Sequence, residues 1–167
     1  GYWVDVLQTA RGCPHDCAFC SVSAFSGRAY RFRPVDDVLD ELGTLRKKNL
    51  IIVDDNIVGA GRAHEERAAA LFEGMIRRNF RKRWVSQAPV SVAGNDEVLR
   101  LMKASGCAGL LIGFESIRPE TLVRMGKRQN LASEDPARYY REVIAKLHRF
   151  GIAVHGHICT DPADERE

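Results

Sequence analysis

The pattern of hydrophobic and polar positions changes its period regularly along the chain. Residues 50–53 read Leu-Ile-Ile-Val, a short continuous apolar run that is typical of a strand buried on both faces. Before this run, apolar residues recur at helical spacing over positions 35–45. Acidic residues at 36–37 fall in the first turn of that helix and basic residues at 46–48 in its last, as the helix dipole favours. The pattern therefore predicts a helix that leads directly into a buried strand.

The same alternation of strand and helix patterns continues through the rest of the chain. Further helices are indicated by apolar faces, with Asn95 and Ser133 as N-terminal caps and Gly106 and Gly151 as C-terminal stops. In all, the pattern predicts five strands, at residues 5–9, 50–53, 84–87, 109–113 and 152–158. Strands that alternate with helices indicate right-handed βαβ units, so the expected fold class is α/β with a parallel sheet.

The length of 167 residues suggests one domain, although the series of strands and helices is expected to break off inside its pattern at the end of the chain. The composition, 45% hydrophobic and 28% charged, is ordinary for a soluble globular protein. The sequence has no secretory signal and no apolar run near the ~20 residues of a membrane span. A net charge of +3 is too small to indicate a nucleic-acid partner, and the basic cluster at 77–83 is interpreted as the solvated end of a helix.

Three of the five cysteines, Cys13, Cys17 and Cys20, fall within eight residues. Disulfides among them would leave an odd thiol and a very tight loop, so reduced thiols in a cytoplasmic protein fit better. The Cys-x3-Cys-x2-Cys segment directly follows the first strand, and parallel α/β folds place their chemistry at the carboxyl ends of strands. Thiolates are the normal ligands of iron–sulfur clusters, and three of them would leave one iron of a [4Fe–4S] cluster open.

Two other interpretations of these cysteines are considered. Unrelated core cysteines are disfavoured, because buried cysteines do not gather in a loop that also contains Gly, Pro, His and Asp. A structural zinc site would need a fourth ligand, which His15 or Cys107 could supply. If they bind no metal, Cys107 and Cys159 are expected to be small core residues. Cys159, however, ends a predicted strand, where functional residues gather. The alternative to an enzyme is thus a structural or regulatory module that binds zinc or an iron–sulfur cluster.

The segment from Thr9 to Val22, with aromatic Phe19 before the third cysteine, resembles the signature of radical S-adenosylmethionine enzymes. The resemblance covers nearly the whole chain and is close to the subgroup whose members usually carry a cobalamin-binding domain ahead of the core. It implies that residues 1–167 are a radical S-adenosylmethionine core, a parallel partial (β/α) barrel truncated after its fifth strand, with the cobalamin domain and the C-terminal part absent. The chain departs from the family at 157–161, which lack the glycine usual after the last strand.

The resemblance also implies a mechanism and its cofactors. A [4Fe–4S] cluster on Cys13, Cys17 and Cys20 would reductively cleave S-adenosylmethionine to a 5′-deoxyadenosyl radical that abstracts a substrate hydrogen. In cobalamin-dependent relatives a methyl group is then delivered to the substrate. Such an enzyme needs an electron donor such as flavodoxin or ferredoxin. The sequence does not name the substrate, which could be a small or lipid-like molecule.

Several residues are implied to contact S-adenosylmethionine. Phe19 is expected to stack near the adenine or to offer its backbone to it. Asp54, Asp55 and Asn56 end the second strand, where relatives bind the methionine end of the cofactor, whose ammonium group requires carbonyl and carboxylate acceptors. A turn or a helix cap is the alternative role for this Asp-Asp-Asn run.

Further candidates follow later strands. Glu115 and Ser116 end the fourth strand and are expected to reach the ribose hydroxyls, with a surface glutamate as the alternative. Gln87 ends the third strand and could point into the barrel. His155 and His157 alternate along the last strand and are predicted to face the same side. They are expected to form a packed pair in the barrel wall, with contact to cofactor or substrate as the alternative.

Overall fold

The computed structural model describes residues 3–159, and in this range it contains a five-stranded parallel sheet. The strand order β1-β4-β5-β6-β7 follows the chain, so every crossover adds its strand to the same edge of the sheet. The strands are β1 (Val4–Leu7), β4 (Asn49–Ile52), β5 (Arg83–Gln87), β6 (Cys107–Glu115) and β7 (Ala153–Ile158). This confirms the predicted α/β fold and all five predicted strands.

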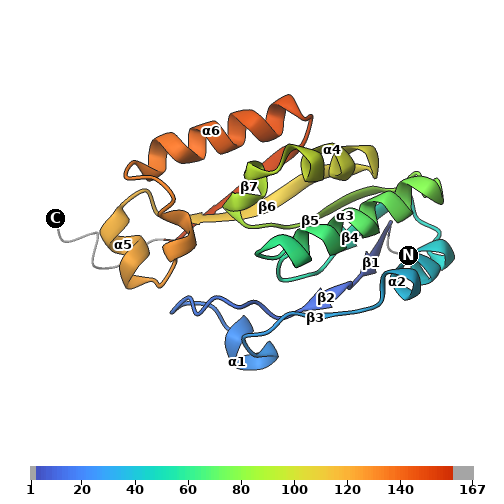
Figure 1. The fold of residues 1–167 in the computed structure, drawn as a ribbon, viewed down its shortest axis with the longest axis horizontal. Helices are drawn as coiled ribbons and strands as arrows, with labels where there is room; N and C mark the ends of the chain where they lie inside the picture. The colour runs from blue at the N-terminus through green and yellow to red at the C-terminus, as the bar shows by residue number, and fades with distance from the viewer. Residues whose placement is uncertain (1–2, 160–167) are drawn as a thin grey trace.

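Helices connect the strands and lie along the sheet (Figure 1). They are α2 (Val35–Thr44), α3 (Arg62–Arg77), α4 (Asp96–Ala104), α5 (Pro119–Arg124) and α6 (Pro136–Arg149). Their apolar faces form one core with alternate strand residues, in which Phe72 of α3 stacks on Trp84 of β5 at a centroid distance of 5.4 Å. Both side chains are fully buried, and each such burial contributes about 1.5–3 kcal/mol.

The opposite face of the sheet is open. On β4, Leu50 and Ile52 are 1% exposed on the helix side, whereas Ile51 is 37% exposed on the other side, and Val6 of β1 is 55% exposed. The prediction that residues 50–53 are buried on both faces was therefore wrong. The sheet instead has the form of a barrel wall, with helices packed against its outer face and an uncovered inner face.

The helix ends agree only in part with the sequence-based expectation. Asn95 caps α4, and its side chain accepts hydrogen bonds from two backbone amides of the first turn. Asp135 rather than Ser133 caps α6, because Pro136 takes the first helical position. The basic residues 46–48 follow α2 instead of ending it, since the helix stops at Thr44.

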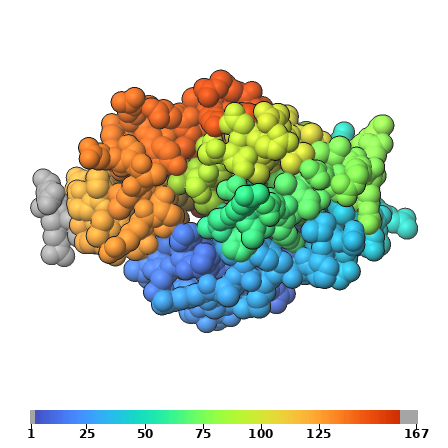
Figure 2. Space-filling view, in the orientation of Figure 1, coloured from blue at the N-terminus to red at the C-terminus, as the bar shows by residue number. Residues whose placement is uncertain are grey.

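A small second sheet was not predicted. Strands β2 (Ala10–Arg11) and β3 (Arg31–Phe32) pair antiparallel and enclose the cysteine loop and helix α1 (Val22–Ser26) between them. Figure 2 shows this N-terminal segment in blue, in contact with the orange segment around α5. Two-residue strands carry no periodicity, so the sequence pattern could not indicate them. No helix within residues 3–159 is long and apolar enough to cross a membrane.

Candidate active site

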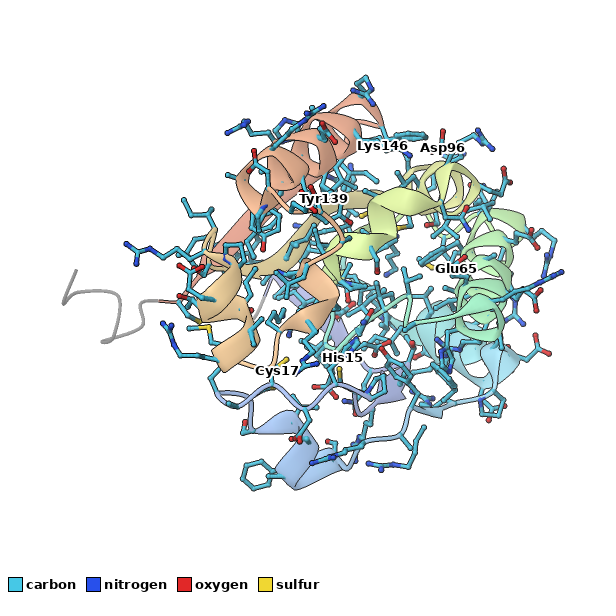
Figure 3. All side chains as sticks on the ribbon, turned by 60° about the vertical axis from the view of Figure 1, so that its left-hand side comes forward. His15, Cys17, Glu65, Asp96, Tyr139 and Lys146 are labelled. Atoms are coloured by element: carbon cyan, nitrogen blue, oxygen red, sulfur yellow. The ribbon has the colours of Figure 1, made fainter. Side chains whose placement is uncertain are left out.

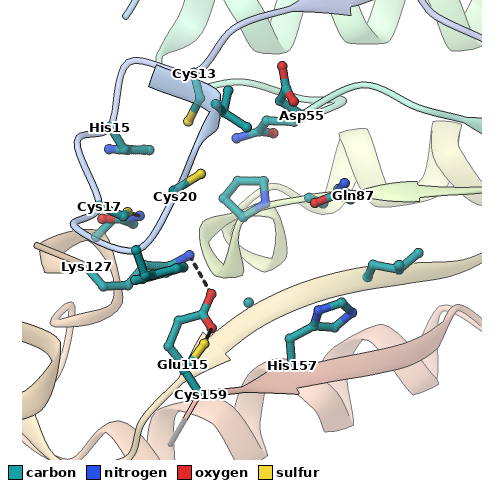
Figure 4. Close-up of a pocket in the computed structure, with 18 of the residues that line it drawn as sticks. Cys13, His15, Cys17, Cys20, Asp55, Gln87, Glu115, Lys127, His157 and Cys159 are labelled. Carbon is teal, nitrogen blue, oxygen red and sulfur yellow. Dashed lines mark hydrogen bonds and ion pairs between the residues drawn. The ribbon is translucent and has the colours of Figure 1, made fainter. Parts of the chain in front are cut away.

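The three clustered cysteines line a single cavity of about 360 Å³ at the carboxyl end of the sheet (Figure 4). Their loop leaves β2 through Gly12, whose φ of 92° is in the left-handed region. A Cβ atom at position 12 would lie 2.2 Å from the carbonyl oxygen of Ala29, so only glycine fits there. The structure thus brings together Cys13, Cys17 and Cys20 as the sequence spacing suggested.

The donor set and its surroundings suit a cluster better than a single ion. Among residues 3–159, no group of three or more His, Cys, Asp or Glu side chains lies close enough together to hold one metal ion. Three thiols that line one cavity match the preference of a [4Fe–4S] cluster for thiolate ligands. Tetrahedral zinc would need a fourth ligand beside them.

The two proposed fourth ligands of a zinc site differ in position. Cys107 begins β6 and is 1% exposed, whereas the cavity lies at the other end of that strand. Burial raises the pKa of the Cys107 thiol to about 12, which is the behaviour of a core residue. His15 does line the cavity, where burial and then the charge of Lys127 lower its pKa and favour the neutral imidazole. Only His15 keeps the zinc alternative open.

The cavity disfavours a free thiolate at Cys13. Burial raises the pKa of this thiol most, and the thiolates of Cys17 and Cys20 raise it further, while a backbone hydrogen bond from His15 and the charge of Lys127 oppose the rise. A bound metal or cluster would therefore have to displace a proton from Cys13, as metal binding by thiols generally does.

A segment more than a hundred residues later in the chain packs against the cysteine loop. The amide of Ala18 donates to the carbonyl of Met125 at 2.9 Å, and a Cβ at Gly126 would lie 2.8 Å from the carbonyl of Asp16. Figure 3 shows Cys17 on this loop, on the side of the molecule opposite Lys146. The segment after α5 thus helps to fix the loop that carries the three thiols.

Glu115 lies at the centre of the cavity's other wall. Its Oε1 is 3.1 Å from Nζ of Lys127, and its Oε2 accepts a hydrogen bond from the Cys159 thiol at 3.0 Å. This hydrogen bond and burial raise the pKa of Cys159 to about 11. Glu115 has a φ of 65°, uncommon for a residue other than glycine and typical of strained functional positions. Strand β6 changes register here, between Gly113 and Glu115, which turns the carboxylate into the cavity.

Four other predicted contacts of S-adenosylmethionine also line the cavity, namely Phe19, Asp55, Asn56 and Gln87. Asp55 accepts a hydrogen bond at 2.8 Å from the amide of Gly12, which ties the end of β4 to the cysteine loop. Asn56 accepts hydrogen bonds from two backbone amides that follow it, so its carbonyl oxygen closes a turn. The structure therefore places all four beside the thiols, and their contacts with the cofactor stay predictions.

Asp54 and Ser116 depart from the prediction, because neither lines the cavity. Asp54 is fully buried, and its Oδ1 accepts the amides of Thr9 at 2.6 Å and Ala10 at 3.0 Å while Oδ2 accepts the Thr9 hydroxyl. Arg67 of α3 donates to the hydroxyl and the carbonyl of the same threonine. Asp54 thus braces the end of β1. Ser116 accepts a backbone amide two residues on and shapes the turn after β6.

His155 and His157 face the same side of β7, as predicted, with ring centroids 5.0 Å apart. Both are exposed, so the expectation of a packed pair was wrong, and His157 lines the cavity. Lys127 and Gln129 also line it, although sequence reasoning gave them no role. The sequence holds no local signal for their role, because their contacts with the loop are distant in sequence.

Comparison with known proteins assigns the family. The profile of the Radical SAM superfamily matches residues 7–163. The chain is 31% identical to bacteriochlorophyllide d C-12(1)-methyltransferase of Chlorobaculum tepidum over 98% of its own length and 35% of that protein. It is 28% identical to hopanoid C-3 methylase of Methylococcus capsulatus over 96% of its length and 30% of that protein. The chain thus spans about a third of these curated relatives.

Solved structures show the same fold. The radical S-adenosylmethionine methyltransferase TsrM from Kitasatospora setae, with cobalamin and a [4Fe–4S] cluster bound, superposes with a TM-score of 0.78. That match has 20% identity and covers 93% of this chain and 30% of the other. The cobalamin-dependent S-adenosylmethionine radical enzyme OxsB gives a TM-score of 0.76 at 20% identity, over 92% of this chain and 23% of that one. With the family profile matched over nearly its whole length, the chain belongs to the radical S-adenosylmethionine superfamily, whose cofactors are a [4Fe–4S] cluster and S-adenosylmethionine.

Proposed function

We propose that this chain is the catalytic core of a radical S-adenosylmethionine methyltransferase that works with cobalamin. The observation that carries this proposal is the single cavity in which Cys13, Cys17 and Cys20 face carboxylates at the ends of parallel strands. A purely structural metal site has no use for Asp55 and Glu115 beside its ligands. A site that must hold a cluster and the charged groups of S-adenosylmethionine together requires both sets of residues.

Each set of side chains has a separate task in this proposal. The three thiolates of Cys13, Cys17 and Cys20 would hold three irons and would leave the fourth open for the amino and carboxylate groups of S-adenosylmethionine. When bound, these cofactors supply the electron transfer and the radical chemistry. Asp55 would accept from the N–H bonds of the cofactor's amino group, Glu115 would accept from its ribose hydroxyls, and the half-exposed ring of Phe19 would lie against its adenine.

Methyl transfer is supported by the relatives. The curated proteins that match include methyltransferases and methylases of pigments and hopanoids, and both structural neighbours named above are described with cobalamin. Because the chain spans about a third of such proteins, cobalamin would be bound by another part of the whole protein. The substrate is an organic molecule of unknown identity. The electron donor would be of the flavodoxin or ferredoxin type, in the reducing cytoplasm.

The alternative is a zinc-binding structural module, which the position of His15 beside the three cysteines supports. Anaerobic reconstitution separates the two. Broad visible absorbance with iron and sulfide in the protein supports the enzyme, whereas a colourless protein that binds zinc tightly and no cluster supports the module.

The substitution Glu115→Gln is expected to weaken binding of S-adenosylmethionine by about tenfold or more. It removes one charge-assisted hydrogen bond, worth about 1.5–3 kcal/mol, while keeping the shape of the side chain. Isothermal calorimetry on the cluster-loaded protein under anaerobic conditions measures the affinity. Ser116→Ala is the matched control, because Ser116 lies next in the chain but outside the cavity, and its affinity should equal that of the wild type. Equal affinities in both variants would remove Glu115 from the binding site.

A further inference from the structure

The cavity holds one cation whose role none of the family comparisons assigns. Among the described residues that line the cavity, Lys127 is the one lysine or arginine, and thus the one side chain with a permanent positive charge. Its side chain is only 16% exposed, so water screens this charge less than it screens a surface lysine. Lys127 comes from the segment after α5 that packs against the cysteine loop.

The ammonium group of Lys127 lies between the thiols and Glu115 (Figure 4). Its Nζ is 3.1 Å from the Oε1 of Glu115 on one side and 5.9 Å from the ring centroid of Phe19 on the other. Phe19 sits in the loop between Cys17 and Cys20. The ion pair is therefore oriented, with its positive end towards the cysteine loop and its negative end towards strand β6.

A second group from the same segment contacts a thiol directly. Nε2 of Gln129 donates to Sγ of Cys17 at 3.6 Å, the range of a hydrogen bond to sulfur. The backbone contacts of Met125 and Gly126 with the loop hold this segment in place. One piece of chain thus supplies a positive charge beside the cysteine loop and an amide hydrogen bond to Cys17.

We propose that Lys127 and Gln129 are positioning residues that raise the reduction potential of the cluster held by Cys13, Cys17 and Cys20. Three thiolates give such a cluster a net negative charge, and one electron from a low-potential reductant adds another without making or breaking a bond. A nearby cation and a hydrogen bond to sulfur stabilise the more negative reduced form. This inference rests on the proposed function, because it requires the cluster.

The test is an anaerobic redox titration of the reconstituted protein without S-adenosylmethionine, using dithionite and mediator dyes and reading the reduced cluster by electron paramagnetic resonance. Lys127→Gln is expected to reduce the ratio of reduced to oxidised cluster about tenfold at a fixed solution potential, which is about 59 mV for a one-electron couple. Lys127→Arg keeps the charge and should stay near the wild type. Gln129→Leu, which loses only the hydrogen bond, should shift the ratio in the same direction by a smaller factor.

Arg128→Gln is the matched control, because it removes the same charge from the neighbouring residue, whose side chain is exposed. Glu115→Gln removes the opposing charge and should shift the ratio the other way, which keeps the proposal testable if Lys127→Gln fails to load a cluster. An unchanged potential in Lys127→Gln that has loaded a cluster, or an equal shift in Arg128→Gln, would overturn the inference. If Lys127→Gln loads no cluster, an unchanged potential in Glu115→Gln would overturn it. Failure of the wild type to form any cluster would instead overturn the proposed function.

Discussion

Cys17→Ala is expected to abolish cluster binding. The iron content after anaerobic reconstitution should fall from about four atoms per chain to a small fraction of that value. Two thiolates cannot hold a [4Fe–4S] cluster that also needs an open iron. The buried Cys17 is the thiol contacted by Gln129, at the point where the loop meets the later segment. Cys13→Ala and Cys20→Ala should behave alike, since the same cavity brings all three thiols together. Iron and sulfide analysis with the visible spectrum gives the measurement.

The remaining cysteines provide matched controls for this loss. Cys107→Ala removes a thiol from the core at the opposite end of β6, and Cys159→Ala removes one that bonds to Glu115 rather than to the loop. Both variants should load iron as fully as the wild type. Full loading of Cys17→Ala, or an equal loss in Cys159→Ala, would show that the ligand set is different.

Asp54→Ala is expected to destabilise the fold by about 3–5 kcal/mol, because it leaves three buried donors without their acceptor beside the Arg67 charge. The carboxylate accepts three hydrogen bonds from residues 9–10, and Arg67 lies beside it. Burial raises the pKa of Asp54, while these hydrogen bonds and the Arg67 guanidinium oppose the rise. Without Asp54, two buried amides and the buried Thr9 hydroxyl would lose their acceptor, and the Arg67 guanidinium would lose a neighbouring negative charge. The midpoint of urea unfolding, followed by circular dichroism, measures the loss.

Asp55→Ala makes the same substitution one residue later. Asp55 is half-buried, and its side chain accepts a single backbone hydrogen bond from Gly12. Its removal should cost only about 1 kcal/mol. A loss in Asp54→Ala no larger than in Asp55→Ala would mean that Asp54 does not brace the end of β1.

The contrast between these two aspartates shows how far the sequence could predict the site. Asp54 and Asp55 end the same strand, and both are carboxylates that suit a ligand site. Successive side chains point to opposite sides, so one faces the core and the other the cavity, and composition cannot tell which. The parallel sheet was predictable because its periodicity is local. The cysteine loop was predictable because its spacing lies within eight residues.

Features that depend on contacts distant in sequence were not predictable. The segment of Lys127 and Gln129 reaches the cysteine loop only through the packing of residues after α5. The exposed inner face of the sheet follows from the shape of the whole barrel wall. The sequence pattern of an apolar strand such as β4 is the same whether its second face is covered or open. The position of Glu115 depends on a register change in β6 and on a positive φ, and the sequence of β6 contains no signal for either feature.

In the proposed site, Cys13, Cys17 and Cys20 hold a cluster with one iron open to S-adenosylmethionine. The most direct measurement is the electron paramagnetic resonance spectrum of the reduced, reconstituted protein before and after S-adenosylmethionine is added. We expect a [4Fe–4S] signal in the wild type whose g values shift on addition, because the cofactor's amino and carboxylate groups would change the coordination of the open iron. A cluster signal that S-adenosylmethionine leaves unchanged at saturating concentration, or a protein that takes up zinc and forms no cluster, would contradict it.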